Sequence, residues 1–202
     1  MGKHVYISAD YDIDSGDRDV VDELNKWSED SHRKVEFTDM AEVASGSVSK
    51  DPDCRICDLK REFNAQIAAS SAVIFVIGDK TARRTAGSEC KRNFIEQAGC
   101  YCTPYKQNAN GIRQCRIRYT CSAAESEDFG NINGYSYLRH EFEQAQRRGK
   151  HIVVVYNSMR RESGWLPSYL KDYESLAQPF WVKDSLGRRV GNYSFIKGEL
   201  GF

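Results

Sequence analysis

The sequence predicts a three-layer α/β fold, in which a central parallel sheet of about five strands has helices on both faces. Strand-like and helix-like segments alternate along most of the 202 residues, and this alternation is typical of parallel sheets with helical crossovers. The run AVIFVI at residues 72–77 is apolar at every position, as in strands that are buried on both faces. A single domain over residues 1–202 is expected, because a chain of this length can bury one sizeable core.

The N-terminal half is expected to supply the first strands and helices. An apolar stripe of Val20, Val21, Leu24 and Trp27 predicts a helix that Asp17 caps. Residues 38–58 are rich in Ser, Gly and Asp and have no sustained period, so a long loop is expected there. Strands are expected at residues 5–8, 34–37 and 72–77, and a second helix at 58–71.

The C-terminal half begins with a polar, cysteine-containing segment at residues 87–133, which we interpret as an insertion before the next crossover helix. Leu138, Phe142 and Ala145 recur at helical spacing, and Gly149 ends that helix. The apolar run at residues 152–156 predicts the strand that follows. The expected order is completed by a short helix at 165–173, a last strand at 179–182 and a closing helix at 192–200.

The charges of the chain are balanced, with 29 basic and 29 acidic residues. This balance does not favour nucleic acid or an anionic membrane as a partner. The sequence shows no signal-peptide core and no apolar run long enough to span a membrane, so we expect a cytoplasmic protein. The 7 cysteines are an odd number, which without an export signal predicts thiols rather than a disulfide framework.

The expected strand ends carry polar residues at 8–11 and 78–81. These positions matter because ligands bind beyond the carboxyl ends of the strands in an open parallel sheet. On the helix before the fourth strand, Tyr137 and Glu141 lie four residues apart and therefore project from one side. The Gly-rich signatures of dinucleotide and nucleoside-triphosphate sites do not occur in the sequence.

Several stretches of the sequence together resemble one known family. They are VYISADY at residues 5–11, Arg18 in the next helix, LKREFNAQIAASSAVIFVIGDKT at 59–81 and YLRHE at 137–141. The combination resembles the TIR domain, and within it the bacterial TIR-like proteins of the ThsB type from Thoeris anti-phage systems. The resemblance covers residues 3 to about 156 apart from the insertion, and it implies a flavodoxin-like fold.

The resemblance implies an enzyme whose substrate is NAD and which needs no further cofactor. Members of this group cleave NAD at the nicotinamide ribosyl bond and convert it to a cyclised or otherwise modified ADP-ribose. That product activates a partner effector after a phage-derived trigger is sensed, and copies of the domain assemble through TIR interfaces. The family's catalytic carboxylate lies in an aromatic-x-x-x-Glu motif, usually led by Trp, which corresponds here to Tyr137 and Glu141.

The residues at these positions suit that chemistry. Loss of nicotinamide leaves an oxocarbenium-like ribose, which a carboxylate such as that of Glu141 can stabilise. The ring of Tyr137 or Tyr11 can stack on the cationic nicotinamide. By the same resemblance, Arg18 is a candidate for binding the diphosphate. The first loop would line the site with Ser8, Ala9, Asp10 and Tyr11.

Simpler roles stay open for the same residues. Glu141 can be a solvated surface carboxylate, and Tyr137 can be the outer edge of the packing face of its helix. Trp27 and Trp165 are expected in the core or in packing contacts. A structural zinc is possible if the insertion folds back onto the long loop, although free thiols are the default. The four zinc ligands would be Cys54, Cys57, Cys100 and Cys102.

Two other functions compete with catalysis. The first is a non-catalytic TIR assembly module, in which Glu141 is incidental and the loop at residues 38–58 contacts neighbouring copies. A substitution of Glu141 distinguishes this module from an enzyme, because assembly survives the change and turnover does not. The second is a phosphoacceptor receiver domain, which shares the alternating architecture. Its acidic pocket and partner residues are imitated by Asp10, Asp12, Asp79, Ser158 and Lys183.

Overall fold

The computed structural model describes residues 3–10, 16–30, 35–39, 52–85, 106–107, 113–114 and 136–201. For residues 52–58, 61, 106–107 and 113–114 the description covers the backbone only. The insertion expected at residues 87–133 therefore lies outside the described residues, apart from two short strands. These strands, β4 (Lys106–Gln107) and β5 (Arg113–Gln114), pair antiparallel.

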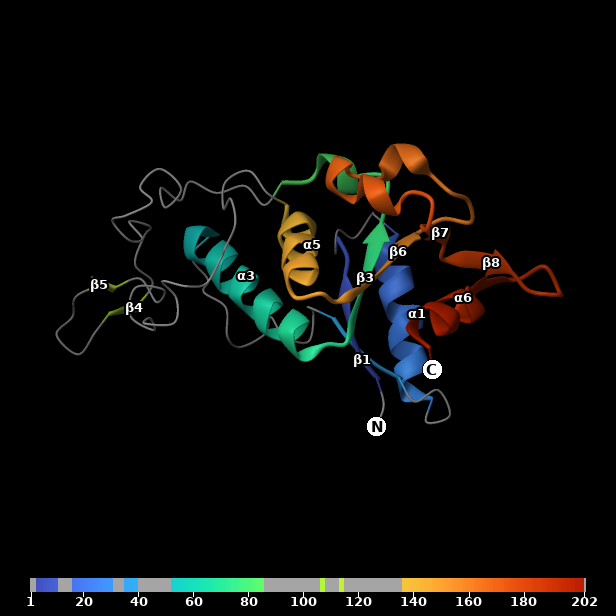
Figure 1. Ribbon diagram of the computed structural model, residues 1–202, viewed down its shortest axis with the longest axis horizontal. Helices are drawn as coiled ribbons and strands as arrows, with labels where there is room; N and C mark the ends of the chain where they lie inside the picture. The colour runs from blue at the N-terminus through green and yellow to red at the C-terminus, as the bar shows by residue number, and fades with distance from the viewer. Residues whose placement is uncertain are drawn as a thin grey trace.

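A five-stranded sheet forms the centre of the fold (Figure 1). Its strands lie in the order β2-β1-β3-β6-β7, and every neighbouring pair is parallel. This order is compatible with a flavodoxin-like fold, and the predicted α/β class with a central parallel sheet is confirmed. The strands are β1 (Lys3–Ser8), β2 (Val35–Thr38), β3 (Ala72–Ile77), β6 (His151–Tyr156) and β7 (Gln178–Pro179).

Helices cover both faces of the sheet (Figure 1). One face carries α1 (Asp17–Glu29) and α6 (Tyr193–Leu200), and the other carries α3 (Pro52–Ala69) and α5 (Tyr137–Arg147). Short 3-10 helices follow β3 and β6, namely η1 (Thr81–Arg83), η3 (Ser163–Trp165) and η4 (Ser168–Tyr173). A small antiparallel pair leads into α6, formed by β8 (Trp181–Lys183) and β9 (Arg189–Gly191).

Alternation along the strands divides the core between the two faces. Val5 and Ile7 of β1 face α1 and α6, where the ring of Trp27 stacks on that of Phe180 with centroids 5.6 Å apart. Tyr6 of β1 faces α3 and α5. All positions of β3 are buried, as the run AVIFVI predicts. Within the described ranges, no helix combines the length and the apolar character needed to cross a membrane.

Two expected boundaries were wrong. α3 begins at Pro52, inside the segment expected to be a loop. Proline suits the first turn of a helix, because the N–H that it lacks would have no intrahelical partner there. The last strand was expected over residues 179–182, but the chain leaves the main sheet after Pro179. Phe180 is fully buried beside Trp27, so the strand breaks where this side chain enters the core.

Candidate functional site

Three strand ends meet at the carboxyl edge of the sheet. Ser8 ends β1, Gly78 follows β3 and Asn157 follows β6. From β1 the chain continues toward β2 on one side of the sheet, and from β3 it continues toward β6 on the other. Open parallel sheets bind ligands at such a switch point, because the diverging connections leave a crevice there.

The side chain of Glu141 lies beneath this edge and contacts β1. The hydroxyl of Tyr6 donates to Glu141 Oε1 at 2.6 Å, and the hydroxyl of Ser8 donates to the other carboxylate oxygen. Glu141 is 2% exposed, so it is not the solvated surface residue that a polar helix permits. Two hydroxyl donors fix the orientation of this buried carboxylate. It is therefore preorganised to accept hydrogen bonds, unlike a mobile carboxylate on the surface.

Burial raises the pKa of Glu141 to about 7, while the hydrogen bonds from Ser8 and Tyr6 act in the opposite direction by favouring the ionised form. Both protonation states are therefore populated near neutral pH. Groups with such a pKa are concentrated at functional sites, because acid–base and electrostatic catalysis require a charge that is poised near the working pH.

Local sequence explains how α5 presents Glu141 to β1. The hydroxyl of Ser136 accepts the backbone N–H of Arg139 at 3.1 Å and so caps the helix. The apolar residues at 138, 142 and 145 face the sheet, and Glu141 falls within this stripe at helical spacing. On β1, alternation places Tyr6 and Ser8 on the same face, so their hydroxyls reach one carboxylate.

A second buried polar contact joins α5 to α3. His140 is fully buried, and its Nε2 donates to Asn64 Oδ1 at 2.9 Å. The pKa of His140 is lowered to about 3, mainly by burial and in smaller part by the nearby charge of Lys60. The imidazole is therefore neutral at physiological pH, and its Nδ1 is buried with no hydrogen-bond partner among the described residues.

On the α1 side of the same edge, a carboxylate ties the strand ends together. Asp17 was predicted to cap α1, but Gly16 holds the cap position with φ 72° and Asp17 is the first helical residue. The buried Asp17 carboxylate instead accepts the backbone N–H of Asp10 at 3.2 Å and the side-chain amide of Asn157 at 2.5 Å. A Cβ at Gly78 would approach Asp17 Oδ1 to 2.8 Å, so a larger residue there would displace the Asp17 carboxylate.

The structure places the predicted site residues in different parts of the fold. The structure brings Ser8 and Glu141 together. Ala9 is buried on the α1 face of the sheet, opposite to Glu141, and Asp10 forms an ion pair with Arg84. Arg18 is exposed in the first turn of α1, in the layer opposite to α5. Tyr11 lies outside the described residues.

Tyr137, one turn before Glu141 on α5, packs against α3. Its partly buried ring contacts Phe63 of α3 edge to face, with centroids 5.5 Å apart. This contact gives Tyr137 the packing role that the sequence left open, since the ring helps to join α5 to α3.

The four possible zinc ligands are not among the side chains that the structure describes. Cys54 and Cys57 belong to α3, and the structure describes only their backbone. Cys100 and Cys102 lie outside the described residues. In the described ranges, no group of three or more His, Cys, Asp or Glu side chains is arranged to hold a metal ion.

Sequence reasoning missed Tyr6 as a site residue, although it lies within the quoted VYISADY stretch. The available signal was the alternation of β1, which puts Tyr6 on the face of Ser8. Comparison of the sequence with protein-family models and with curated proteins gave no match. The site must therefore be interpreted from its own geometry and from the motifs quoted above.

Proposed function

We propose that this chain is an NAD-cleaving enzyme of the TIR type, which makes a cyclic or otherwise modified ADP-ribose that activates a partner effector in anti-phage defence. The observation that carries the proposal is the buried Glu141 carboxylate. It lies at the carboxyl edge of the sheet, is oriented by hydroxyls from β1 and has a pKa of about 7. A surface glutamate that serves only solubility needs none of these features.

In the proposed reaction, the bond between ribose C1′ and the pyridine nitrogen breaks. Its electron pair goes to the ring nitrogen, so nicotinamide leaves as a neutral molecule and needs no acid. The ribosyl cation that remains is stabilised by the ionised Glu141, which accepts hydrogen bonds from the ribose hydroxyls in place of Ser8. Water, or a nucleophilic atom of the same nucleotide, then adds to C1′ and loses its proton to Glu141.

Other residues of the edge have supporting roles in this proposal. Tyr6 keeps Glu141 oriented when substrate displaces the hydroxyl of Ser8. Arg18 and Arg84 are the cations available for the diphosphate, and Arg84 is already held by Asp10. The ring of Tyr11 is a candidate for stacking on nicotinamide.

The proposal also covers the extent of the domain, its assembly, its trigger and the state of its cysteines. We propose one TIR-like domain over residues 1–202, with the cysteine-containing insertion at 87–133 and assembly through TIR interfaces. The trigger would be a phage component, and the enzyme would act in the cytoplasm with NAD as its substrate. The cysteines at 54, 57, 100 and 102 would be thiols, with a structural zinc as the alternative.

The experiment is mass spectrometry of small molecules from cells that express the wild type, Glu141→Gln or Glu143→Gln, with and without phage challenge. Glu143 is a matched control, because it lies on the same helix but pairs with Arg139 at 3.1 Å and is partly exposed. The wild type and Glu143→Gln should lose NAD and gain an ADP-ribose species, whereas Glu141→Gln should not. NAD loss that persists in Glu141→Gln would contradict the proposed role of this carboxylate.

A specific observation favours a second candidate, the non-catalytic assembly module. Both oxygens of Glu141 are occupied by hydroxyls of the chain itself, and the side chain is 2% exposed. In this candidate, the carboxylate fixes α5 on β1 and has no part in catalysis. Unchanged NAD in all three proteins, with assembly retained in Glu141→Gln, would establish this candidate.

No observation on the described residues favours the third candidate, the phosphoacceptor receiver domain. Asp79 is exposed, and Lys183 is exposed on β8 of the small sheet rather than after a strand of the main sheet. The hydroxyl of Ser158 bonds within its own turn, to the backbone of Arg160. Asp12 lies outside the described residues, and Asp10 is paired with Arg84.

A further inference from the structure

The outer edge of β6 is only partly covered by another strand. β3 pairs with β6 along its whole length, from Ala72 opposite His151 to Ile77 opposite Tyr156. On the other side, β7 pairs only with Val155 and Tyr156. Within the described residues, the stretch 151–154 of β6 therefore has no neighbouring strand on its outer side.

The hydrogen-bonding direction of this stretch follows from its neighbours. Asn157 N–H donates toward β3, to Ile77 O at 3.0 Å, whereas Tyr156 O accepts from Phe180 N–H at 2.9 Å on the outer side. Because these directions alternate along a strand, the backbone groups of Ile152 and Val154 point outward. An edge with such groups is a template for pairing with another extended chain.

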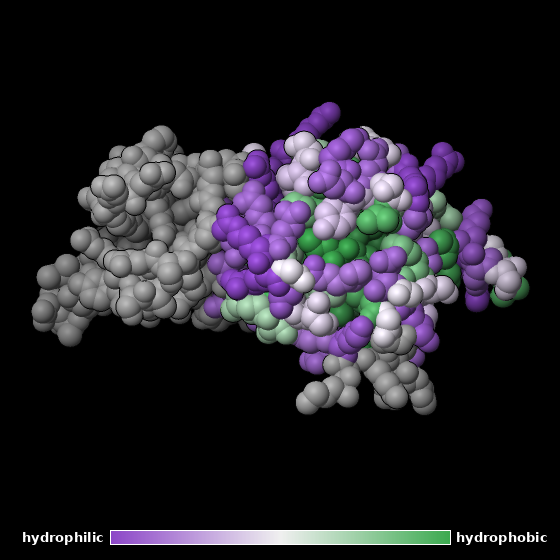
Figure 2. All heavy atoms as spheres, viewed as in Figure 1, coloured by the Kyte–Doolittle hydropathy of each residue, from purple (hydrophilic) through white to green (hydrophobic). Residues whose placement is uncertain are grey.

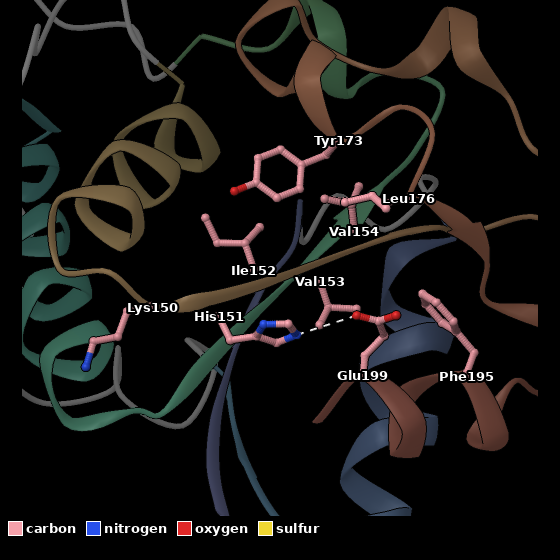
Figure 3. Close-up of a pocket in the computed structure, with 9 residues that line it drawn as sticks. All are labelled: Lys150, His151, Ile152, Val153, Val154, Tyr173, Leu176, Phe195 and Glu199. Atoms are coloured by element: carbon pink, nitrogen blue, oxygen red, sulfur yellow. Dashed lines mark ion pairs between the residues drawn. The ribbon is translucent and has the colours of Figure 1, made fainter. Parts of the chain in front are cut away.

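This stretch of β6 lies at the bottom of a hollow of about 280 Å³, which is lined by apolar and by ionisable side chains. Figure 3 shows Tyr173 and Leu176 on one side of β6, and Phe195 and Glu199 of α6 on the other. Figure 2 shows apolar side chains gathered in a hollow in this region of the surface. Leu176 is 63% exposed, so its side chain is accessible to a partner that enters the hollow.

The charges around the hollow favour a basic partner. Among the described residues that line it, Glu199 is the only carboxylate. Its Oε2 lies 3.5 Å from Nε2 of His151, and both side chains are about half exposed. The ammonium of Lys150 is already used, because it donates to the carbonyl oxygens of Ala68 at 2.9 Å and Ser70 at 2.6 Å. Glu199 is thus the charge that a partner can reach.

We propose that this hollow, the β6 groove, binds an extended peptide segment of a partner protein, which adds to the sheet beside residues 151–154. Its alternate side chains would lie against Leu176 and Tyr173 on one side and against Phe195 on the other. A Lys or Arg at one end would pair with Glu199. A single extended peptide suits this edge better than the β6 edge of a second copy, because side chains flank the edge on both sides and would flank it in both copies.

The test is fluorescence anisotropy with the full chain and a labelled peptide in which valine and threonine alternate between terminal arginines. The wild type should bind this probe saturably, and Leu176→Glu should weaken binding about tenfold or more, because it places a charge in the apolar wall. Leu186→Glu is the matched control, since Leu186 is 74% exposed in the turn between β8 and β9, away from the groove. This variant should bind as the wild type does.

Further probes separate strand addition from simple adsorption. Glu199→Lys should lose the arginine-ended probe and gain a probe that ends in glutamates. A probe methylated on its backbone nitrogens should not bind, because it keeps its side chains but cannot pair with β6. Binding of the methylated probe, equal loss in Leu186→Glu or no saturable binding would overturn the proposal. So would a wild-type dimer, detected by light scattering, that Leu176→Glu dissociates.

This proposal is independent of NAD cleavage. The residues that line the β6 groove do not include Glu141 or its partners on β1. Glu141→Gln should therefore bind the arginine-ended probe with the affinity of the wild type. A loss of probe binding in Glu141→Gln would contradict the separation of the two sites.

Discussion

The helices on the two faces of the sheet bury different kinds of side chain. α1 inserts Val20, Val21, Leu24 and Trp27 into an apolar core, and its buried Asp17 lies at the strand ends rather than in that core. α5 instead buries polar and charged residues within the layer itself. They are His140, Glu141 and Gln144, among Leu138, Phe142 and Ala145.

This difference supports the proposal that the functional site lies on the α5 face. Burial of a polar group costs free energy unless the group is hydrogen-bonded, so an apolar residue at the same place would usually be more stabilising. The α1 face has the apolar core that is expected when burial serves stability alone. The α5 face keeps Glu141 and His140 in costly positions, as expected for a face that is shaped by function.

The largest expected effect on stability is on the α1 face. Trp27→Ala should lower the free energy of unfolding by about 3–5 kcal/mol, because it leaves a cavity between α1 and the C-terminal segment. The ring of Trp27 contacts Phe180 at 5.6 Å and Tyr193 at 5.1 Å between centroids. Urea unfolding measures the change, and Glu141→Gln should cost much less. If Glu141→Gln lowered the free energy of unfolding more than Trp27→Ala does, the α5 face rather than the α1 face would contribute more to stability.

The next effect is the dependence of stability on pH. The pKa of Glu141 is raised from 4.5 to about 7 in the folded state. Between these values the folded chain binds more protons than the unfolded chain, so stability is full at low pH and falls as the pH rises. The loss approaches about 3 kcal/mol above pH 7.

Urea unfolding of the wild type and of Glu141→Gln between pH 4.5 and 8 checks this expectation. The difference in stability between the two proteins should change in favour of the variant as the pH rises. A constant difference would mean that Glu141 titrates normally in the folded protein. Under the proposed function, the rate of NAD cleavage should rise with pH and level off above about 7, because the ionised form of Glu141 would stabilise the ribosyl cation.

A smaller effect is expected at the contact between α3 and α5. Asn64→Leu removes the acceptor of the His140 Nε2–H bond, which is 2.9 Å long, and leaves a buried donor. The expected loss of stability is about 1–3 kcal/mol. Addition of His140→Phe should recover part of that loss in a double-mutant cycle, since the unsatisfied group disappears. Additive losses would show that the two side chains are not coupled.

The smallest effect is expected from Tyr6→Phe. This change removes the hydroxyl that donates to Glu141 Oε1 at 2.6 Å and leaves the ring in the core. Because that hydrogen bond favours the ionised form, its loss should raise the pKa of Glu141 by about one unit. The pH–rate profile should move to higher pH by the same amount. A shift to lower pH would contradict the donor role of Tyr6.

Much of the fold could be predicted because it depends on local periodicity. The run AVIFVI and the stripe at 20, 21, 24 and 27 are buried as their patterns indicate. The break at Phe180 and the start of α3 at Pro52 could not be predicted. The first depends on space beside Trp27, and the second depends on a proline that suits a first helical turn as well as a loop.

The sequence by itself determined which segments become strands and helices, and that Ser8 and Glu141 are candidates for the site. Only the tertiary structure decided that Glu141 is buried against Tyr6 and Ser8, that Tyr137 contacts Phe63, and that β7 pairs with only the last two residues of β6. The physical reason is separation along the chain. The hydroxyls of β1 and the carboxylate of α5 lie more than a hundred residues apart, and only the crossover connections of the parallel sheet bring them together.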